Sequence, residues 1–310
     1  MTQHQHSRVS ICVGSALRST QPTVCERFFR VVGHVYNTAP GGLGIRSGTR
    51  EDSTMPGNFG TRARYVMGSS MARLTHALLS SSWFPLTRYV PRGSIFWYDV
   101  ACFAATRRLN VIFDVGANVG QTAWGLVRYF PTATIYCFEP ASGPFKMLQS
   151  QYGSRKNVRC INSALGAAVE TRTLLVGEDS ELNTFVTDGP RRDRLNAQES
   201  VEVDTVDRFC ETRNIVQIDV LKMDVQGWEC EVLRGAGRMI AENRVCFIVS
   251  EVGFSRSGAD MVHFSDLHAA MERSGYLFCG LYENFRCGPA NQFVSFANAL
   301  YANPHRRTQT

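Results

Sequence analysis

A glycine loop follows an apolar run near the middle of the chain and offers the clearest chemistry. The run 111–115 leads into Gly116 and Gly120 within the sequence Asp-Val-Gly-Ala-Asn-Val-Gly. Gly116 permits a tight turn, and Gly120 lets the first turn of a helix approach a bound ligand closely. Glu139 ends the next apolar run about twenty residues later, where a carboxylate can accept both hydroxyls of a ribose. The pattern predicts a nucleoside-type ligand.

Two classes of ligand use this layout. Dinucleotide enzymes favour G-x-G-x-x-G, because a pyrophosphate rests on backbone N–H groups at a helix N-terminus. Here Gly116 and Gly120 enclose Ala-Asn-Val, so the dinucleotide spacing is absent. S-adenosylmethionine has no pyrophosphate and needs a looser loop, so the pattern favours it. A nicotinamide-dependent oxidoreductase on a similar fold stays the alternative.

A second motif places charges inside another apolar run. In Leu-Lys-Met-Asp-Val-Gln-Gly-Trp-Glu, residues 221–229, the strand period of two puts Lys222 and Asp224 on one face. Charges in a central strand are costly unless they are paired. Either Lys222 forms a structural ion pair, with Asp114 on the adjacent strand, or Asp224 faces the methyl donor or the acceptor hydroxyl.

The elements that must position these residues alternate along the chain. Apolar runs separated by helical periods are typical of a mainly parallel, doubly wound α/β sheet covered on both faces. Ligands bind beyond the carboxyl ends of such strands, so the chemistry should lie at 114–120, Glu139, 162–163, Asp224 and Glu251. We expect strands over 111–115, 134–139, 158–162, 219–224, 245–251, 276–282 and 293–301, a β excursion over 171–176 and 201–204, and helices over 120–130, 143–152, 206–213, 228–233 and 264–274.

Composition suggests four regions. Residues 1–64 are rich in Gly, Ser, Thr, Pro and Arg and are expected to be a disordered or loosely attached leader, with only a weak likeness to a signal peptide. Residues 65–108 show helical periods and are expected to form a helical lid. The ligand-binding domain should span 109–303, and 304–310 should be a tail.

Charge and cysteine content narrow the class of protein. The net charge is +6 and much of the excess lies in the terminal segments, which does not indicate a nucleic-acid groove. No run approaches the roughly 18 apolar residues of a membrane helix. The ten cysteines include no C-x-x-C pair, and several lie in strand patterns, which favours a reducing cytoplasm.

The chain resembles the FkbM family of methyltransferases. The resemblance is carried by Val-Ile-Phe-Asp-Val-Gly-Ala-Asn-Val-Gly-Gln-Thr from 111, Thr-Val-Asp-Arg-Phe-Cys from 205, and Leu-Lys-Met-Asp-Val-Gln-Gly-Trp-Glu-Cys-Glu-Val-Leu-Arg-Gly-Ala from 221. It covers about 111–303. It implies a class I methyltransferase (Rossmann-like) fold, S-adenosylmethionine as cofactor, and methyl transfer to a hydroxyl of a sugar, glycolipid or secondary metabolite.

The resemblance also implies roles for individual residues. Glu139 would hold the ribose, and Asp224 would lie beside the reacting methyl group. Ser163 and Ala164 would lie near the adenine. Trp228 stands where the family more often has a small residue, which could alter the acceptor side. The methionine part of the donor would be surrounded by Asp114, Gly116, Asn118 and Gly120.

Methyl transfer to a hydroxyl benefits from a general base. Asp224 and Glu251, at strand ends, are the catalytic candidates; together they could instead hold a divalent cation, although no metal site is expected. His263 and His268 are weaker candidates, and Asn183 and Thr184 could meet the acceptor. A catalytically inactive binding domain and an RNA methyltransferase are further alternatives.

Overall fold

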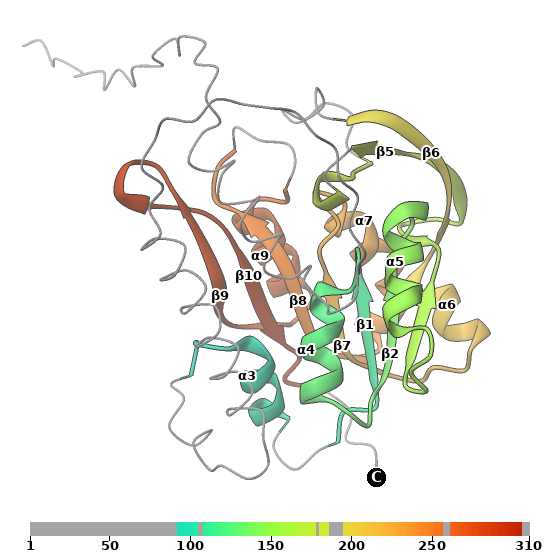
Figure 1. The fold of residues 1–310 in the computed structure, drawn as a ribbon. Coiled ribbons are helices and arrows are strands. Elements are labelled where there is room, and N and C mark those ends of the chain that lie inside the picture. The colour runs from blue at the N-terminus through green and yellow to red at the C-terminus, as the bar shows by residue number, and fades with distance from the viewer. Residues whose placement is uncertain (1–91, 105–107, 178–179, 186–194, 257–260, 306–310) are drawn as a thin grey trace, which may run out of the picture. The chain divides into compact units, whose positions relative to one another are not determined.

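The computed structural model describes residues 92–104, 108–177, 180–185, 195–256 and 261–305 (Figure 1). The expected leader, 1–64, and the first expected lid helix lie outside the described residues, and the expected tail is described only as far as His305. The boundaries expected for the regions therefore stay predictions.

A seven-stranded sheet carries the fold. Its order is β3-β2-β1-β7-β8-β10-β9; β10 pairs antiparallel with both of its neighbours, and the other pairings are parallel. The expected doubly wound α/β class is thereby confirmed. The strands are β1 Val111–Val115, β2 Thr134–Phe138, β3 Val158–Ile161, β7 Ile218–Met223, β8 Val245–Gly253, β9 Leu277–Cys287 and β10 Phe293–Ala302.

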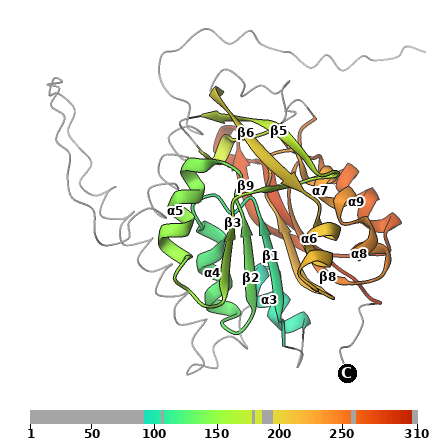
Figure 2. The same cartoon turned by 90° about the vertical axis from the view of Figure 1, so that its right-hand side faces the viewer.

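Helices cover both faces of this sheet. Figure 2 shows α4 and α5 on one face and α6 to α9 on the other. In the described ranges no helix is long and apolar enough to cross a membrane. The helices are α3 Phe96–Phe103, α4 Gln121–Tyr129, α5 Ser142–Tyr152, α6 Val206–Thr212, α7 Glu229–Gly235, α8 Gly237–Ala241 and α9 Phe264–Arg273.

Neighbouring strand residues enter opposite cores, which explains why the central strands are continuously apolar. Ile112 and Val220 join the core under α3, α4 and α5, whereas Phe113 and Leu221 join the core under α6 to α9. All four side chains are completely buried. A polar residue in these strands is therefore confined to an end, or must be paired.

Helix α3 is the described part of the expected lid segment. Trp97 packs against Gly125 of α4, where its Nε1 would lie 2.9 Å from an added Cβ. The buried Asp99 accepts a hydrogen bond of 2.7 Å from the hydroxyl of Tyr282 in β9. The described contacts of α3 thus join it to α4 and β9.

A three-stranded sheet confirms the expected β excursion. Its order is β4-β6-β5, from Ala164–Leu165, Leu195–Asp204 and Glu170–Gly177. The short helix η2, Ser180–Leu182, follows β5. In Figures 1 and 2 this sheet lies beyond the end to which β1 points.

Strand β9 departs from the sequence-based expectation. The expected strand ended at Tyr282, but β9 continues to Cys287. Two of its residues, 283 and 284, stand opposite the single residue Ala297 of β10, because Tyr282 pairs with Asn298 and Phe285 with Phe296. This β-bulge hides the strand period from the sequence.

The amino ends of β1 and β7 are joined by a buried carboxylate. Oδ2 of Asp219 accepts hydrogen bonds from the backbone N–H groups of Asn110, at 2.6 Å, and Val111, at 3.0 Å. Its Oδ1 accepts from Nε2 of Gln217 at 2.8 Å. One side chain therefore accepts from three donors, of which the Gln217 amide is buried and the two backbone N–H groups are partly buried.

Replacing this carboxylate should destabilise the fold. We expect Asp219→Ala to lower the free energy of unfolding by about 3 kcal/mol, because it leaves the buried Gln217 amide and two partly buried backbone N–H groups without their acceptor. Urea denaturation measures this, with the exposed Glu170→Ala expected to cost less than about 0.5 kcal/mol. Equal effects of the two substitutions would contradict the role given to Asp219.

Candidate functional site

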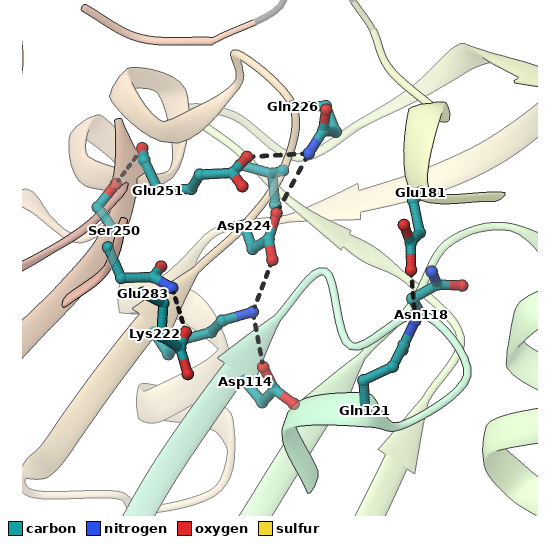
Figure 3. Close-up of polar contacts among 12 residues, drawn as sticks. Asp114, Asn118, Gln121, Glu181, Lys222, Asp224, Gln226, Ser250, Glu251 and Glu283 are labelled. Carbon is teal, nitrogen blue, oxygen red and sulfur yellow. Dashed lines mark hydrogen bonds and ion pairs between the residues drawn. The ribbon is translucent and has the colours of Figure 1, made fainter. Parts of the chain in front are cut away.

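Polar side chains form a row across five strands of the sheet, on the face covered by α3, α4 and α5. Alternation places Asp114 with Ile112 and Lys222 with Val220 on this face. Glu251 likewise follows Val249, and its partner in β10 is Asn298. In Figure 3, Lys222 lies between Asp114 and Asp224, and Gln226 lies between Asp224 and Glu251. We call Asp114, Lys222, Asp224, Glu251, Glu283 and Asn298 the polar row.

Lys222 anchors the row. Asp114 and Lys222 are paired neighbours on β1 and β7, and both are buried. Nζ of Lys222 lies 3.6 Å from Oδ1 of Asp114 and 3.0 Å from Oδ2 of Asp224. The ion pair expected between Lys222 and Asp114 is confirmed, and Asp224 is a second partner whose side chain remains 36% exposed.

The protonation of this group follows from its burial and charges. Burial lowers the pKa of Lys222, but the carboxylates of Asp224 and Asp114 outweigh it, so the pKa is raised and the amine keeps its charge. Burial raises the pKa of Asp114 despite Lys222. Neither oxygen of Asp114 has a hydrogen-bond donor among the described residues. Lys222 is thus held charged, with Asp224 as its exposed partner.

Gln226 joins Asp224 to Glu251, the other predicted catalytic residue. Its Nε2 lies 3.2 Å from Oδ1 of Asp224 and 3.1 Å from Oε2 of Glu251 (Figure 3). Gln226 adopts a left-handed backbone with φ of 50°. One amide therefore holds the two carboxylates on adjacent strands close together.

The strand ends β1 and β7 meet at Gly116. A Cβ on Gly116 would lie 1.9 Å from the carbonyl oxygen of Asp224, and φ there is +79°. The backbone N–H of Asp224 donates to the carbonyl of Val115 at 3.0 Å. Only glycine permits this crossing. Gly116 therefore sets the distance between the glycine loop and Asp224.

Gly120 lies directly against side chains of α5, which leaves no room for a side chain of its own. Its φ is +98°, and an added Cβ would lie 2.5 Å from the ring of Tyr152 and 3.1 Å from Leu148. The missing side chain makes room for α5. Close packing of α5 is therefore one reason for glycine at this position, and the expected approach to a ligand stays a prediction.

Glu139 closes the turn between the glycine loop and α5. Its Oε2 accepts from the backbone N–H of Asn118 at 2.9 Å, and Oε1 accepts from Ala141 at 2.8 Å. Burial raises the pKa of Glu139 to about 7, although both backbone donors oppose the shift. Each oxygen keeps a second acceptor position, so the carboxylate can still receive hydroxyl groups.

Ser163 and Ala164 lie just beyond β3. The Ser163 hydroxyl is within 2.9 Å of the carbonyls of both Ala164 and Glu202, which attaches this segment to β6. Ala164 packs with Ala141 in the apolar cluster of the three-stranded sheet. Ala141 also donates to Glu139, so this apolar cluster begins beside the buried carboxylate.

The β excursion touches the glycine loop. The Ser180 hydroxyl donates to Oδ1 of Asn118 at 2.8 Å. Nε2 of Gln121 donates to Oε1 of Glu181 at 3.1 Å, a contact drawn in Figure 3. Asn118 has φ of 48°. Helix η2 and the start of α4 are therefore in contact, a relation between distant segments that the sequence did not predict.

Glu229 was also missed as a residue of the site. It is buried, and its Oε1 accepts from the backbone N–H groups of Val225, at 3.2 Å, and Gly227, at 3.4 Å. Burial raises its pKa to about 7. A carboxylate after a Gly-Trp pair at the start of a helix was the available signal for this loop-closing role.

Trp228 belongs to the packing of the excursion. Its ring lies 5.1 Å from that of Phe185, and the guanidinium of Arg172 lies 4.5 Å from its centroid. Thr184 donates to the carbonyl of Gln226 at 2.8 Å, whereas Asn183 accepts from Gly177 at 3.1 Å. These contacts attach the excursion to the loop that follows Asp224.

The two histidines have structural contacts. Nδ1 of His263 accepts from the backbone N–H of Ser265 and caps α9. The His268 ring stacks on Phe264 at 5.3 Å. Within the described ranges, no group of three or more His, Cys, Asp and Glu side chains is arranged to hold a metal ion.

The strand order and the residues at the carboxyl ends of the parallel strands together define a class of protein. The sheet order, with the antiparallel β10 inserted between β8 and β9, is that of class I methyltransferases. The strand order reverses at β1, because β2 and β3 lie on one side of it and the later strands lie on the other. Glu139 and the polar row lie at the strand ends around this reversal, which is the usual ligand position in such sheets.

The family model of the methyltransferase FkbM domain matches residues 114–278, more than half of the chain. The chain therefore belongs to the FkbM methyltransferase family, and S-adenosylmethionine is its cofactor by that membership. The resemblance noted in the sequence is confirmed. Glu283 and Asn298 lie beyond the matched residues.

Two curated relatives are similar over part of the chain. Methyltransferase 1 of Beauveria bassiana is 28% identical over 156 residues, 44% of this chain and 61% of that protein. The 2-O-methyltransferase NoeI of Sinorhizobium fredii is 26% identical over 157 residues, 46% of this chain and 62% of that protein. The matches span about three fifths of each relative's length.

Solved structures are similar at low identity. TrmK of M. capricolum, in complex with S-adenosyl-homocysteine, matches at 11% identity and a TM-score of 0.39, covering 70% of this chain and 71% of that one. Aeropyrum pernix fibrillarin, with bound S-adenosyl-L-methionine, matches at 13% and 0.36, covering 66% and 73%.

The Gly116 crossing predicts a sharp effect on ligand binding. Gly116→Ala must displace the glycine loop from Asp224, so we expect the affinity for S-adenosylhomocysteine to fall roughly tenfold or more. Equilibrium dialysis measures it. Gly143→Ala is the matched control, because no atom lies within 4 Å of its added Cβ. Equal affinities of the two variants would contradict the claim that ligand binding needs the close approach of Gly116 to Asp224.

Proposed function

We propose that the chain transfers a methyl group from S-adenosylmethionine to a hydroxyl of a sugar, glycolipid or secondary metabolite. The carrying observation is the pair of Asp224 and Glu251, held by Gln226 at the ligand edge. The similarity to a protein named 2-O-methyltransferase supports a hydroxyl acceptor. The class of acceptor and the absence of a nucleic-acid partner are proposed for the whole protein in the same way.

The donor side fits residues around the glycine loop. Glu139 would receive the ribose hydroxyls, and the apolar surface at Ala164, with Ser163, would lie beside the adenine. The loop residues Asp114, Gly116, Asn118 and Gly120 would surround the methionine part. Of these, Gly116 and Asn118 are partly exposed, whereas the Asp114 carboxylate is buried and paired with Lys222.

The acceptor side has two carboxylates for a proton. When bound, S-adenosylmethionine supplies an activated methyl group, which the acceptor oxygen receives as the carbon–sulfur bond breaks and its electron pair stays on sulfur. Asp224 or Glu251 takes the hydroxyl proton onto a carboxylate oxygen. General-base help of this kind contributes about 10²–10⁴-fold. Lys222 and Gln226 keep the two carboxylates in place.

A location in the cytoplasm and an acceptor other than nucleic acid complete the proposal. The eight described cysteines form no disulfide, as in proteins of reducing compartments. The carboxylates exposed at the ligand edge repel the phosphates of nucleic acid.

The direct test is methyl transfer itself. The purified chain is incubated with S-adenosylmethionine carrying a deuterated methyl group and with hexose methyl glycosides, and products are analysed by mass spectrometry. The proposal expects a labelled methyl ether on a hydroxyl. Transfer to nitrogen or carbon only, or none to any hydroxyl, would contradict it.

The raised pKa of Glu139 predicts a pH dependence of donor binding. A carboxylate accepts ribose hydroxyls better than a protonated carboxyl, so S-adenosylhomocysteine affinity should increase as pH rises through about 7. Glu139→Gln should weaken binding and remove this dependence. Calorimetry from pH 6 to pH 8, a range chosen about that pKa, measures both.

The stability of the fold should fall as pH rises toward 7, whereas ligand affinity should rise as pH passes through 7. The folded protein holds the Glu139 proton to about pH 7, while the unfolded carboxyl loses it near 4.5, so the free energy of unfolding falls between these values. Glu229, whose pKa is also about 7, contributes the same fall. Glu229→Gln is therefore the matched control: it should reduce the fall in stability but keep the pH dependence of binding. If Glu229→Gln lost the pH dependence of binding, the assignment of that dependence to Glu139 would be wrong.

A further inference from the structure

Most backbone N–H groups of the glycine loop are already engaged within the protein. Those of Gly116 and Ala117 both donate to the last carbonyl of β2, at 3.0 and 2.9 Å. The N–H of Asn118 donates to Oε2 of Glu139 at 2.9 Å, and that of Gly120 donates to the carbonyl of Ala117 at 2.8 Å. A ligand could use these four donors only by breaking the bonds that shape the loop.

An anionic group at this loop therefore needs another donor. Free backbone N–H groups bind pyrophosphate in dinucleotide folds, so their engagement here agrees with the absence of the dinucleotide spacing. S-adenosylmethionine still carries a carboxylate on its methionine part, and a carboxylate that leaves water needs hydrogen-bond donors. Among the described contacts, the loop donors without an acceptor are the N–H of Val119 and Nδ2 of Asn118. Asn118 is partly exposed, and its Nδ2 is not a buried atom.

Ser180 orients the side-chain amide of Asn118. Its hydroxyl, in helix η2, donates to Oδ1 of Asn118 at 2.8 Å. An amide whose oxygen is held by Ser180 turns its NH₂ group away from Ser180, because oxygen and nitrogen occupy the two branches of the same planar group. Asn118 has a left-handed φ of 48°, a conformation in which Asn is enriched. The β excursion therefore determines which way this donor of the glycine loop faces.

Further contacts hold η2 in place. Nε2 of Gln121, at the start of α4, donates to Oε1 of Glu181 at 3.1 Å (Figure 3). The backbone N–H of Asn183 donates to the carbonyl of Ser180 at 3.3 Å, and Oδ1 of Asn183 accepts from the N–H of Gly177 at 3.1 Å. The hydroxyl of Ser180 is thus presented to the glycine loop from a turn that is restrained on its own side as well.

We infer that Ser180 is a positioning residue of the donor site, which turns Nδ2 of Asn118 toward the carboxylate of the methionine part of S-adenosylmethionine. The inference rests on the donor placement in the proposed function and adds a residue of the β excursion to it. Nδ2 donates to a carboxylate oxygen, and such charge-assisted hydrogen bonds are stronger than those between neutral groups. Asn118 keeps its backbone N–H on Glu139, so one residue connects the amino-acid end of the donor site with its ribose end.

Two ligands that differ in the amino-acid part separate this role from general packing. S-adenosylhomocysteine carries the carboxylate, whereas methylthioadenosine keeps the adenine, the ribose and the sulfur but lacks the amino-acid group. Calorimetric titration of the full chain with each ligand gives the ratio of the two affinities. Asn118→Gly keeps the left-handed backbone and the N–H on Glu139. It should weaken S-adenosylhomocysteine binding by roughly tenfold or more and leave methylthioadenosine binding nearly unchanged.

Variants of Ser180 test whether it acts through Asn118. Ser180→Ala frees the amide to rotate and should weaken S-adenosylhomocysteine binding by roughly three- to tenfold, with methylthioadenosine binding unchanged. Ser180→Thr, which keeps the hydroxyl, should restore most of the loss. In the Asn118→Gly background, Ser180→Ala should cause no further loss. Thr173→Ala, at an exposed position of β5 in the same small sheet, is the matched control and should change neither affinity.

The outcomes distinguish this inference from the proposed function. Ser180→Ala that leaves S-adenosylhomocysteine affinity unchanged, weakens both ligands equally, or keeps its full effect in the Asn118→Gly background would overturn the inference and leave the methyltransferase function standing. Binding of neither ligand by the unaltered chain would contradict the donor placement in the proposed function and this inference with it.

Discussion

A lysine buried in the middle of a parallel sheet is the constraint on which the rest of the site depends. An uncompensated ammonium there would be prohibitively costly, so Lys222 requires carboxylates within reach. Asp114 and Asp224 supply them from the adjacent strand and from the residue after its own strand. Their charges keep the amine protonated, and Asp224 is thereby held at the edge where β1 and β7 end.

The loops around this ion pair carry local strain. Asn118, Gln226 and Glu283 all adopt left-handed backbone conformations that are unusual for non-glycine residues. Each holds a side chain in a polar contact: Asn118 with Ser180, Gln226 with Asp224 and Glu251, and Glu283 with Asn298. Such strain collects at functional sites, because packing elsewhere must hold it in place. The three residues lie in the glycine loop, between the joined carboxylates and in the bulge of β9.

The sheet and the centre of the site could be predicted from the sequence because they depend on local patterns. Continuous apolar runs predicted the central strands, and the charges two residues apart in one run offered the pairing of Lys222 with Asp114 as one of two alternatives. The two-residue strand β4 and the short helix α8 are too brief for a period to be recognised. The packing of Gly120 against the Tyr152 ring is a contact between segments that no local pattern encodes.

Glu283 shows most clearly where sequence reasoning ends. The expected strand stopped at Tyr282, one residue before Glu283, although Asn284 stands in the bulge. The pairing of β9 with β10 creates the bulge and reverses the direction of that one side chain. The contact of η2 with the glycine loop was hidden for a similar reason: it joins segments about sixty residues apart.

The central claim is that the edge between β1 and β7 binds an S-adenosyl nucleoside and not a dinucleotide. Calorimetric titration of the full chain with S-adenosylhomocysteine, and with NAD in a parallel cell, tests it most directly. Saturable binding of S-adenosylhomocysteine together with no heat from NAD is the result that the loop, Glu139 and the family membership predict. Saturable binding of NAD, with none of S-adenosylhomocysteine, would contradict the account.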